Sequence, residues 1–209
     1  MPTAPTVPSP SGTPTAPGPS AAPEGARRLF FALWPSAAMQ RELEAAARIP
    51  PDSMRGGRQV AAESLHLTLA FLGSVPEASL EAVKECARIA SRASRIAPPA
   101  LGVTLDTIEY WPRSQLLCAT PGREPAGAAE FAEDLQRGLC DAGFTPDRTP
   151  FRAHVTLARR VRRRPAGEPP VLEMPQVRWT CADFALVDSR TGPGGSAYSV
   201  LESWLLCRS

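Results

Sequence analysis

The chain has 209 residues, a formal net charge of +2 and a hydrophobic content of 43%. This charge is too small to indicate a strongly basic nucleic-acid-binding surface by itself, and no run approaches the roughly 18 apolar residues of a membrane-spanning helix. The chain does not open with the charged start and apolar stretch of a secretory signal. We therefore expect a cytoplasmic protein that does not contact a membrane.

Residues 1–27 differ in composition from the rest of the chain. They contain 8 of the 24 prolines, mixed with Ala, Ser, Thr and Gly, and almost no large apolar side chain. Such a segment cannot bury enough apolar surface to offset the entropy lost when it orders. The sequence therefore predicts a disordered Pro/Ala/Ser/Thr-rich tail over residues 1–27 and one folded domain over residues 28–209.

Apolar periodicity predicts strand, helix, strand and helix in the first half of the domain. Residues 28–34 form a short apolar and aromatic run that is typical of a strand. Ser36 can then cap a helix that ends near Pro50. Alternation of apolar and polar residues predicts a strand over 64–72, and helical spacing predicts a helix over 77–92.

The second half of the domain is richer in strands. Two strand candidates, 101–110 and 115–120, are joined by a turn at 111–113, and a helix is expected over 128–142. Three further strands are expected over 151–158, 177–188 and 197–207. Strands and helices intermix with hairpin-like neighbours, so the pattern predicts an α+β fold.

A five-residue repeat carries the chemistry of this sequence. His66 and His154 both begin the sequence H-x-T-L-A, and they are the two histidines of the chain. Residues i and i+2 of a strand share one face, so each histidine is expected beside its threonine, Thr68 or Thr156, while the intervening residue faces the core. If two similar lobes face each other, these strands present two imidazoles and two hydroxyls to one groove.

This set of groups suits the opening of a cyclic phosphodiester. One group must take a proton from water and another must protonate the departing oxygen, and the ordinary imidazole pKa of about 6.5 allows both roles. Threonine hydroxyls can donate to the nonbridging phosphate oxygens. A single H-x-T is more often an ordinary half-buried strand segment, but the matched pair favours a functional site.

Metal or cysteine chemistry is less well supported. Two histidines so far apart in sequence, without H-E-x-x-H, match no usual ligand spacing, so we expect no metal and no cofactor. The five cysteines are scattered without a C-x-x-C pair and are expected to be buried, reduced thiols: Cys86, Cys118, Cys140, Cys181 and Cys207.

The repeated motif and its flanks resemble a known family. H-x-T occurs twice, R-L-F-F-A-L-W-P opens the domain, H-L-T-L-A-F-L-G begins at His66, and P-F-R-A-H-V-T-L-A-R surrounds His154. In this order these segments resemble the LigT-like 2H phosphoesterases, specifically bacterial RNA 2′,3′-cyclic phosphodiesterases, over the whole region from Arg28 to the C-terminus.

The resemblance implies a fold, a reaction and a site. The fold would be α+β, with two pseudo-symmetric lobes of antiparallel sheet, helices outside, and a groove between the lobes that carries both H-x-T motifs. The reaction would be metal-independent hydrolysis of an RNA terminal 2′,3′-cyclic phosphate to a 2′-phosphomonoester. His66 would be the proton donor and His154 the proton acceptor, while Thr68 and Thr156 would bind the phosphate. We expect a monomer.

Two positions near the second motif depart from a simple pattern. Relatives often carry proline at the position of Ala153, which affects backbone stiffness more than chemistry. Arg159 follows the motif as in the family and is a candidate phosphate contact. Strict alternation would place it on the face opposite His154 unless the strand twists or bulges.

The remaining candidates have stronger structural explanations. The basic run made of Arg160, Arg162, Arg163 and Arg164 is expected to be a solvated loop, with RNA-backbone contact as the alternative. Four aromatic residues are expected in the core, with base stacking as the alternative: Phe30, Trp111, Phe151 and Tyr198. The glycine-rich segment 192–195 is expected to be a flexible turn.

Two other functions stay open at this stage. The same site can join RNA ends through a 2′-5′ linkage, because a ribose hydroxyl and water can use the same base. The domain can also serve as a noncatalytic nucleotide-binding module, although two intact H-x-T motifs count against that reading.

Overall fold

The computed structural model describes residues 25–51, 54, 57–94, 101–162, 171–192 and 195–206. Within them lie the helices α1 (Ala37–Ala46), α3 (Leu80–Ala93) and α4 (Ala126–Asp141), and the short 3-10 helices η1 (Ala62–Ser64) and η2 (Glu77–Ser79). The strands are β1 (Ala26–Leu33), β2 (Arg58–Gln59), β3 (Leu67–Pro76), β4 (Leu101–Trp111), β5 (Leu116–Thr120), β6 (Val155–Arg159), β7 (Leu172–Cys181), β8 (Asp183–Gly192) and β9 (Gly195–Leu205).

The strands form one antiparallel sheet that consists of two similar halves. Their order is β7-β4-β5-β6-β3-β1-β8-β9, and β2 pairs with β6 outside this path. The first lobe contains β3, β1, β8 and β9, and the second contains β6, β5, β4 and β7. The pairing of Leu67 with Val155 joins β3 to β6 and so connects the lobes. The expected α+β fold with two antiparallel lobes is confirmed.

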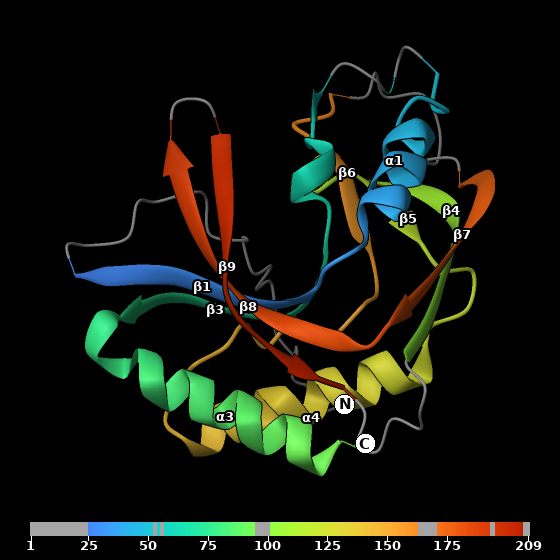
Figure 1. Cartoon of the computed structure of the whole chain (residues 1–209). Helices are drawn as coiled ribbons and strands as arrows, with labels where there is room; N and C mark the ends of the chain where they lie inside the picture. Colours follow the sequence, from blue (N-terminus) through green and yellow to red (C-terminus); the bar gives the residue numbers. More distant parts are fainter. Residues whose placement is uncertain are drawn as a thin grey trace, which may run out of the picture.

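The helices hold the two lobes together from outside the sheet. Helices α3 and α4 lie side by side, and α4 contacts both β3 and β4, one strand from each lobe (Figure 1). Helix α1 packs against β7. An aromatic cluster fills the space beneath the first lobe, where the ring centroid of Phe184 lies 4.8 Å from that of Phe131 and 6.0 Å from that of Phe31.

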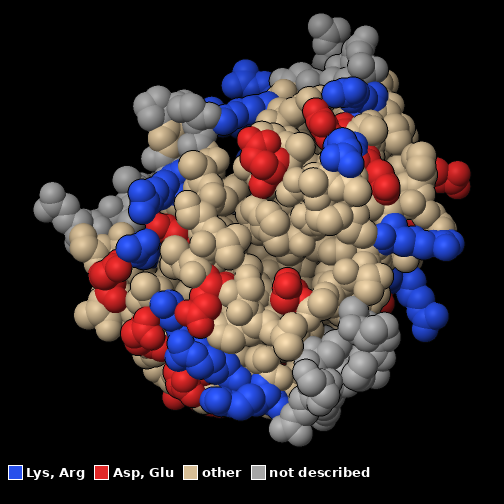
Figure 2. Space-filling view, viewed as in Figure 1, with Lys and Arg blue, Asp and Glu red and all other residues tan. Residues whose placement is uncertain are grey.

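Charged side chains lie mainly around the margin of the face shown in Figure 2, whose middle is largely uncharged. Over α3 they form ion pairs that fasten this helix to β9. The Glu202 carboxylate of β9 forms ion pairs with Lys84 Nζ, at 3.3 Å, and with an Arg88 guanidinium nitrogen, at 3.4 Å.

No helix in the described part of the chain is long and apolar enough to cross a membrane.

The first strand begins two residues earlier than expected. Ala26 and Arg27 belong to β1, and the Arg27 side chain forms ion pairs with Glu77 and with the buried Asp188. A buried carboxylate requires such a partner, because an unpaired charge in the interior is costly. Residues 1–24, which make up most of the predicted tail, lie outside the described residues.

The expected single strand over 177–188 is wrong. It consists of β7 and β8, which turn at Ala182 and belong to different lobes. Cys181 pairs with Leu101 of β4, whereas Asp183 pairs with Leu205 of β9. The apolar pattern continues through this corner without Gly or Pro, so the local sequence contains no signal for the change of partner.

The expected strand over 151–158 is shorter in the structure, because β6 begins at Val155. The residues before it form other hydrogen bonds: Ala153 N–H donates to the Glu124 carboxylate at 2.8 Å.

The expectation that all five cysteines are buried thiols needs a correction. Cys86, Cys118 and Cys181 are buried free thiols, but Cys140 is exposed on α4, and Cys207 lies outside the described residues.

Replacing Gly57 by alanine tests how closely β2 must approach β6. An added Cβ would lie 2.6 Å from the Arg159 carbonyl oxygen and 2.6 Å from Val161 Cγ2, closer than real Cβ contacts. We expect Gly57→Ala to lower the free energy of unfolding by about 1–3 kcal/mol, measured by denaturant titration. Gly102→Ala is the matched control, because nothing lies within 4 Å of its added Cβ. Equal stability of the two variants would contradict the packing described here.

Candidate active site

The junction between the lobes brings both H-x-T motifs together. Leu67 and Val155, the residues that follow the two histidines, are partners in the antiparallel ladder and are fully buried. Continuing this register by one residue in each direction sets His66 opposite Thr156 and Thr68 opposite His154. These four side chains are half-buried and lie on the face opposite Leu67 and Val155, as expected. Each histidine directly precedes its strand instead of lying within it.

Both motifs contain a β-bulge at the same residue. In β3 the ladder with β1 passes from Thr68 to Ala70 and skips Leu69. In β6 the ladder with β5 passes from Thr156 to Ala158 and skips Leu157. The extra residue reverses the alternation, so both residues that follow each threonine are buried.

The bulge decides the position of Arg159. After the buried pair Leu157 and Ala158, Arg159 is exposed and emerges on the side that carries His154 and Thr156. Its positive charge lowers the pKa of both His66 and His154. The sequence left open whether the strand bulges before Arg159, and the structure shows that it does.

The two imidazoles are held in the same way. His66 Nδ1 lies 2.7 Å from the Ser64 carbonyl oxygen, and His154 Nδ1 lies 2.8 Å from the Arg152 carbonyl oxygen. In each case the acceptor is two residues earlier, so each Nδ1 carries the donated proton. This fixes each ring orientation and assigns the lone pair of the neutral ring to Nε2. Either Nε2 can accept a proton, or donate one when the ring is charged.

Aromatic rings surround His66. Trp34 stacks on it with ring centroids 5.3 Å apart and an angle of 4° between the planes. The centroids of Phe30 and Tyr198 lie 4.8 and 5.0 Å from that of His66. The sequence analysis did not single out Trp34, which it placed at the end of the predicted strand 28–34, whereas in the structure β1 ends at Leu33 and Trp34 follows it.

One aromatic ring and several charged groups surround His154. The Trp111 ring centroid lies 4.5 Å from that of His154, and the Arg152 guanidinium lies 4.8 Å from the Trp111 centroid. The Glu109 carboxylate accepts one hydrogen bond from Trp111 Nε1, at 3.0 Å, and one from an Arg152 guanidinium nitrogen, at 2.5 Å. Glu109 thereby fixes the ring and the cation in one stack beside the histidine.

Burial disfavours the charged form of both histidines. It lowers the pKa of His66 to about 4, against the opposing effect of the Ser64 carbonyl, and the charges of Arg159 and His154 lower it further. Burial also lowers the pKa of His154, and the charges of Arg152 and Arg159 act in the same direction. The Arg152 carbonyl and the Glu124 carboxylate raise it. At neutral pH both rings of the free protein are therefore neutral.

Thr156 has a buried thiol as its strand partner, whereas Thr68 has an alanine. Cys118 of β5 pairs with Thr156, and Ala32 of β1 pairs with Thr68. Burial raises the pKa of the Cys118 thiol to about 12, and the neighbouring Thr156 hydroxyl opposes this shift. Cys118 therefore remains a protonated thiol at neutral pH and is a packing partner of the threonine.

Some of the remaining residues considered in the sequence analysis lie in the core, and others lie beside the histidines. Phe30 is buried and Phe151 packs on the core, as expected, although Phe30 also contacts His66. Tyr198 is half-buried, packs on the small buried cluster that contains Phe30, and also lies beside His66. The core expectation is wrong for Trp111, which is half-buried beside His154 and belongs to neither buried cluster. In the basic run, Arg160 and Arg162 are exposed, whereas Arg163 and Arg164 lie outside the described residues. In segment 192–195, Gly192 pairs with Gly195, and Pro193 and Gly194 lie outside the described residues.

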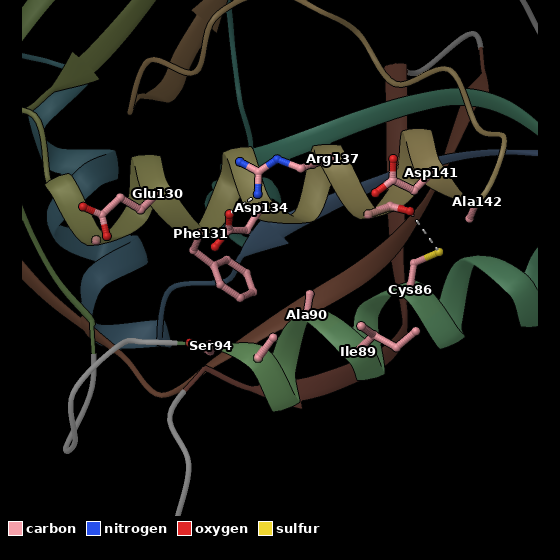
Figure 3. A pocket seen from close by; sticks show the side chains of 13 residues that line it. Cys86, Ile89, Ala90, Ser94, Glu130, Phe131, Asp134, Arg137, Asp141 and Ala142 are labelled. Carbon is pink, nitrogen blue, oxygen red and sulfur yellow. Dashed lines mark hydrogen bonds and ion pairs between the residues drawn. The ribbon is translucent and has the colours of Figure 1, made fainter.

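A cavity of about 780 Å³ lies between α3 and α4, and its lining contains no residue of either H-x-T motif (Figure 3). Among the described residues, His, Cys, Asp and Glu side chains form no group of three or more that is arranged to hold a metal ion. The candidate active site is therefore the pair of motifs at the junction of the lobes, with Arg159 beside them.

A bilobed antiparallel sheet that pairs two H-x-T motifs defines the class to which this protein belongs. The model of the 2′-5′ RNA ligase superfamily matches residues 35–193. The RNA 2′,3′-cyclic phosphodiesterase of Escherichia coli (strain K12) is 34% identical over 86% of this chain and 97% of its own length. The protein of the same name from Thermus thermophilus is 34% identical over 86% of this chain and 90% of its own length.

A solved structure gives the same result. The crystal structure of E. coli LigT complexed with 3′-AMP aligns with a TM-score of 0.70 and 30% sequence identity, over 88% of this chain and 99% of that one. The chain therefore belongs to the LigT-like 2′-5′ RNA ligase superfamily, and the resemblance drawn from its motifs is confirmed.

Titration of the two imidazoles tests their burial. We expect the Cε1–H resonance of His66 to titrate near pH 4, and that of His154 below its ordinary value of 6.5. Trp34→Ala should raise the pKa of His66, because opening the ring stack restores water to the imidazole. The His66→Gln variant assigns the two signals. A midpoint of 6.5 or higher for His66 would contradict the effect of burial.

Proposed function

We propose that this protein hydrolyses the terminal 2′,3′-cyclic phosphate of RNA to a 2′-phosphomonoester, with His66 and His154 as an acid-base pair and without a metal ion. The observation that carries this proposal is the pairing of Leu67 with Val155, which brings together two identically held imidazoles. The names of the E. coli and T. thermophilus relatives support the same substrate.

Hydrolysis requires one proton transfer on each side of the phosphorus atom. His154 Nε2 takes a proton from water as the water oxygen attacks phosphorus. His66 Nε2 gives a proton to the ribose O3′ as the bond between O3′ and phosphorus breaks, and the phosphate stays on O2′. The Nδ1 hydrogen bonds to the Ser64 and Arg152 carbonyls keep both rings in the orientation these transfers need.

Charge on the nonbridging oxygens increases during this reaction and needs donors. The Thr68 and Thr156 hydroxyls lie on the face of the histidines, and we assign them to these oxygens. Arg159, which the bulge brings to the same side, supplies a positive charge. Donors that are already oriented in the free protein stabilise the pentacovalent state without further reorganisation.

The protonation state of the free site limits this mechanism. Burial keeps His66 neutral at neutral pH, yet a proton donor must be charged. A bound phosphate anion favours the imidazolium, because an opposite charge at close range raises the pKa of a histidine. We therefore infer that substrate binding and uptake of one proton are coupled, and that the pH dependence of the rate is bell-shaped and belongs to the coupled pair.

The superfamily description gives one specific reason to consider a second reaction. A ribose 5′-hydroxyl that occupies the place of the attacking water would form a 2′-5′ linkage with the same base and acid. Incubating the protein with a cyclic-phosphate RNA and a 5′-hydroxyl RNA separates the two reactions, because ligation lengthens the chain and hydrolysis does not.

Alanine variants test the acid-base pair. We expect His66→Ala and His154→Ala each to lower kcat on a 2′,3′-cyclic-phosphate oligonucleotide by about 10² to 10⁴-fold, the usual contribution of one general acid or base. The assay contains excess chelator, which should leave the wild-type rate unchanged, because both proton transfers use imidazoles alone. A variant that keeps more than about a tenth of the rate would remove its histidine from the mechanism. Loss of wild-type activity in chelator would overturn metal independence.

A second substrate assigns the two roles. In a 2′-phosphodiester that releases 4-nitrophenolate, the leaving oxygen needs no protonation, so the proton donor becomes dispensable while the base stays essential. We expect His66→Ala to recover most of its lost rate on this substrate and His154→Ala to stay inactive, with nitrophenolate release followed by absorbance. Recovery of the His154 variant instead would exchange the two roles.

A further inference from the structure

The segment between β5 and α4 reaches the backbone next to His154. Glu124 Oε1 accepts the Ala153 N–H at 2.8 Å. Ala153 lies between Arg152, whose carbonyl holds His154 Nδ1, and His154 itself. A contact at this peptide therefore restrains both the carbonyl that orients the ring and the residue that carries it.

A second hydrogen bond fixes the segment that carries Glu124. Asp106 of β4 accepts the Gly122 N–H at 2.6 Å, and a Cβ at Gly122 would lie 3.1 Å from that carboxylate. The segment thus has an anchor on β4 two residues before Glu124. Together the contacts connect β4, through Gly122 and Glu124, to the backbone before His154.

The backbone N–H group directly before the histidine has a different kind of acceptor in each motif. Before His66, the chain forms the 3-10 helix η1, where Ser64 N–H donates to the Ala61 carbonyl at 2.8 Å and Leu65 N–H to the Ala62 carbonyl at 3.1 Å. Leu65 occupies the position that corresponds to Ala153, so a backbone carbonyl accepts in the first motif and a carboxylate in the second. An alanine N–H makes this second contact possible, and a proline there would have no proton to donate.

Charges from several elements face His154. Arg152 precedes it, Arg159 extends from β6, and Glu124 comes from the segment after β5. Glu109 of β4 acts through Trp111 and Arg152, and His66 lies across the junction. Glu124 is the carboxylate among them whose charge opposes the two arginines at this imidazole.

We propose that Glu124 is a positioning residue for His154, which holds the preceding peptide through the Ala153 N–H and sets a negative charge beside the imidazole. This inference rests on the proposed function, since it assigns Glu124 to the second half of the same acid-base pair. Its two parts separate chemically, because the hydrogen bond needs an acceptor oxygen whereas the electrostatic effect needs a charge.

Three variants of the full chain separate these parts. Glu124→Gln keeps an acceptor oxygen and removes the charge, Glu124→Ala removes both, and Ala153→Pro removes the donor and keeps the charge. Glu130→Gln, on the wall of the cavity between α3 and α4 in Figure 3, is the matched control for loss of one carboxylate. Because the chain has two histidines, NMR titration follows both imidazoles without any substrate.

We expect Glu124→Gln to shift the titration of His154 to lower pH and to leave that of His66 and the midpoint of thermal unfolding unchanged. Glu124→Ala should show the same shift and also lower kcat by about threefold to tenfold with little change in KM, because a displaced base loses reactive geometry. Ala153→Pro should lower kcat less than Glu124→Ala, because proline removes the donor but also stiffens the backbone before His154, and it should leave the His154 titration unchanged. Glu130→Gln should behave as wild type in every measurement.

An unchanged His154 titration in Glu124→Gln, or a wild-type kcat in Glu124→Ala, would overturn the assignment. If Ala153→Pro fails to fold, the Glu124 variants still decide the question. If the wild-type protein does not turn over the cyclic phosphate, only the proposed function is refuted. The titration of His154 in Glu124→Gln still tests the effect of Glu124 on His154, because it needs no substrate.

Discussion

The pairing of Leu67 with Val155 is the interaction on which the arrangement of the site depends. It is the point where β3 of one lobe meets β6 of the other, and each partner directly follows a histidine. A shift of this register by one residue would exchange site and core faces across the junction, because side chains alternate along a strand. One pair of residues is a small contact, and helix α4, which touches β3 of the first lobe and β4 of the second, provides a further connection between the lobes.

The shared bulge explains why both motifs extend beyond H-x-T. Leu69 and Leu157 are the extra residues, and each is buried with the alanine that follows it. Two adjacent buried residues anchor each strand in the core just after its threonine, and the reversed alternation then returns the next residue to the site side. The residue after the buried pair is Arg159 in the second motif and Phe71 in the first. The same β-bulge therefore places a charged side chain on the site side in one lobe and an aromatic ring in the other.

The sequence predicted the parts of this site that depend on local pattern. Alternation over H-x-T-L-A placed both histidines and threonines on one face, and helical spacing located α3 and α4 within a few residues. It did not predict the corner at Ala182, where the apolar pattern continues unbroken, nor Trp34 and Glu124. These two residues act through partners 29 or more positions away in sequence, His66 and Ala153, and no periodicity within one element encodes such contacts.

The two halves of the site hold equivalent imidazoles in different surroundings. Both Nδ1 atoms donate to the carbonyl two residues earlier, yet three aromatic rings enclose His66, whereas one ring, two arginines and a carboxylate face His154. Rings that exclude water penalise the imidazolium and offer it no counter-charge, so the surroundings of His66 leave a bound anion as the main source of stabilisation for its charged form. Around His154, Glu124 opposes the arginines before any ligand arrives. A sheet built on an internal repeat can therefore place two equivalent imidazoles in different electrostatic surroundings, because Arg152 and Glu124, which act on His154, lie outside the repeated strand, whereas Arg159 at the end of β6 acts on both rings.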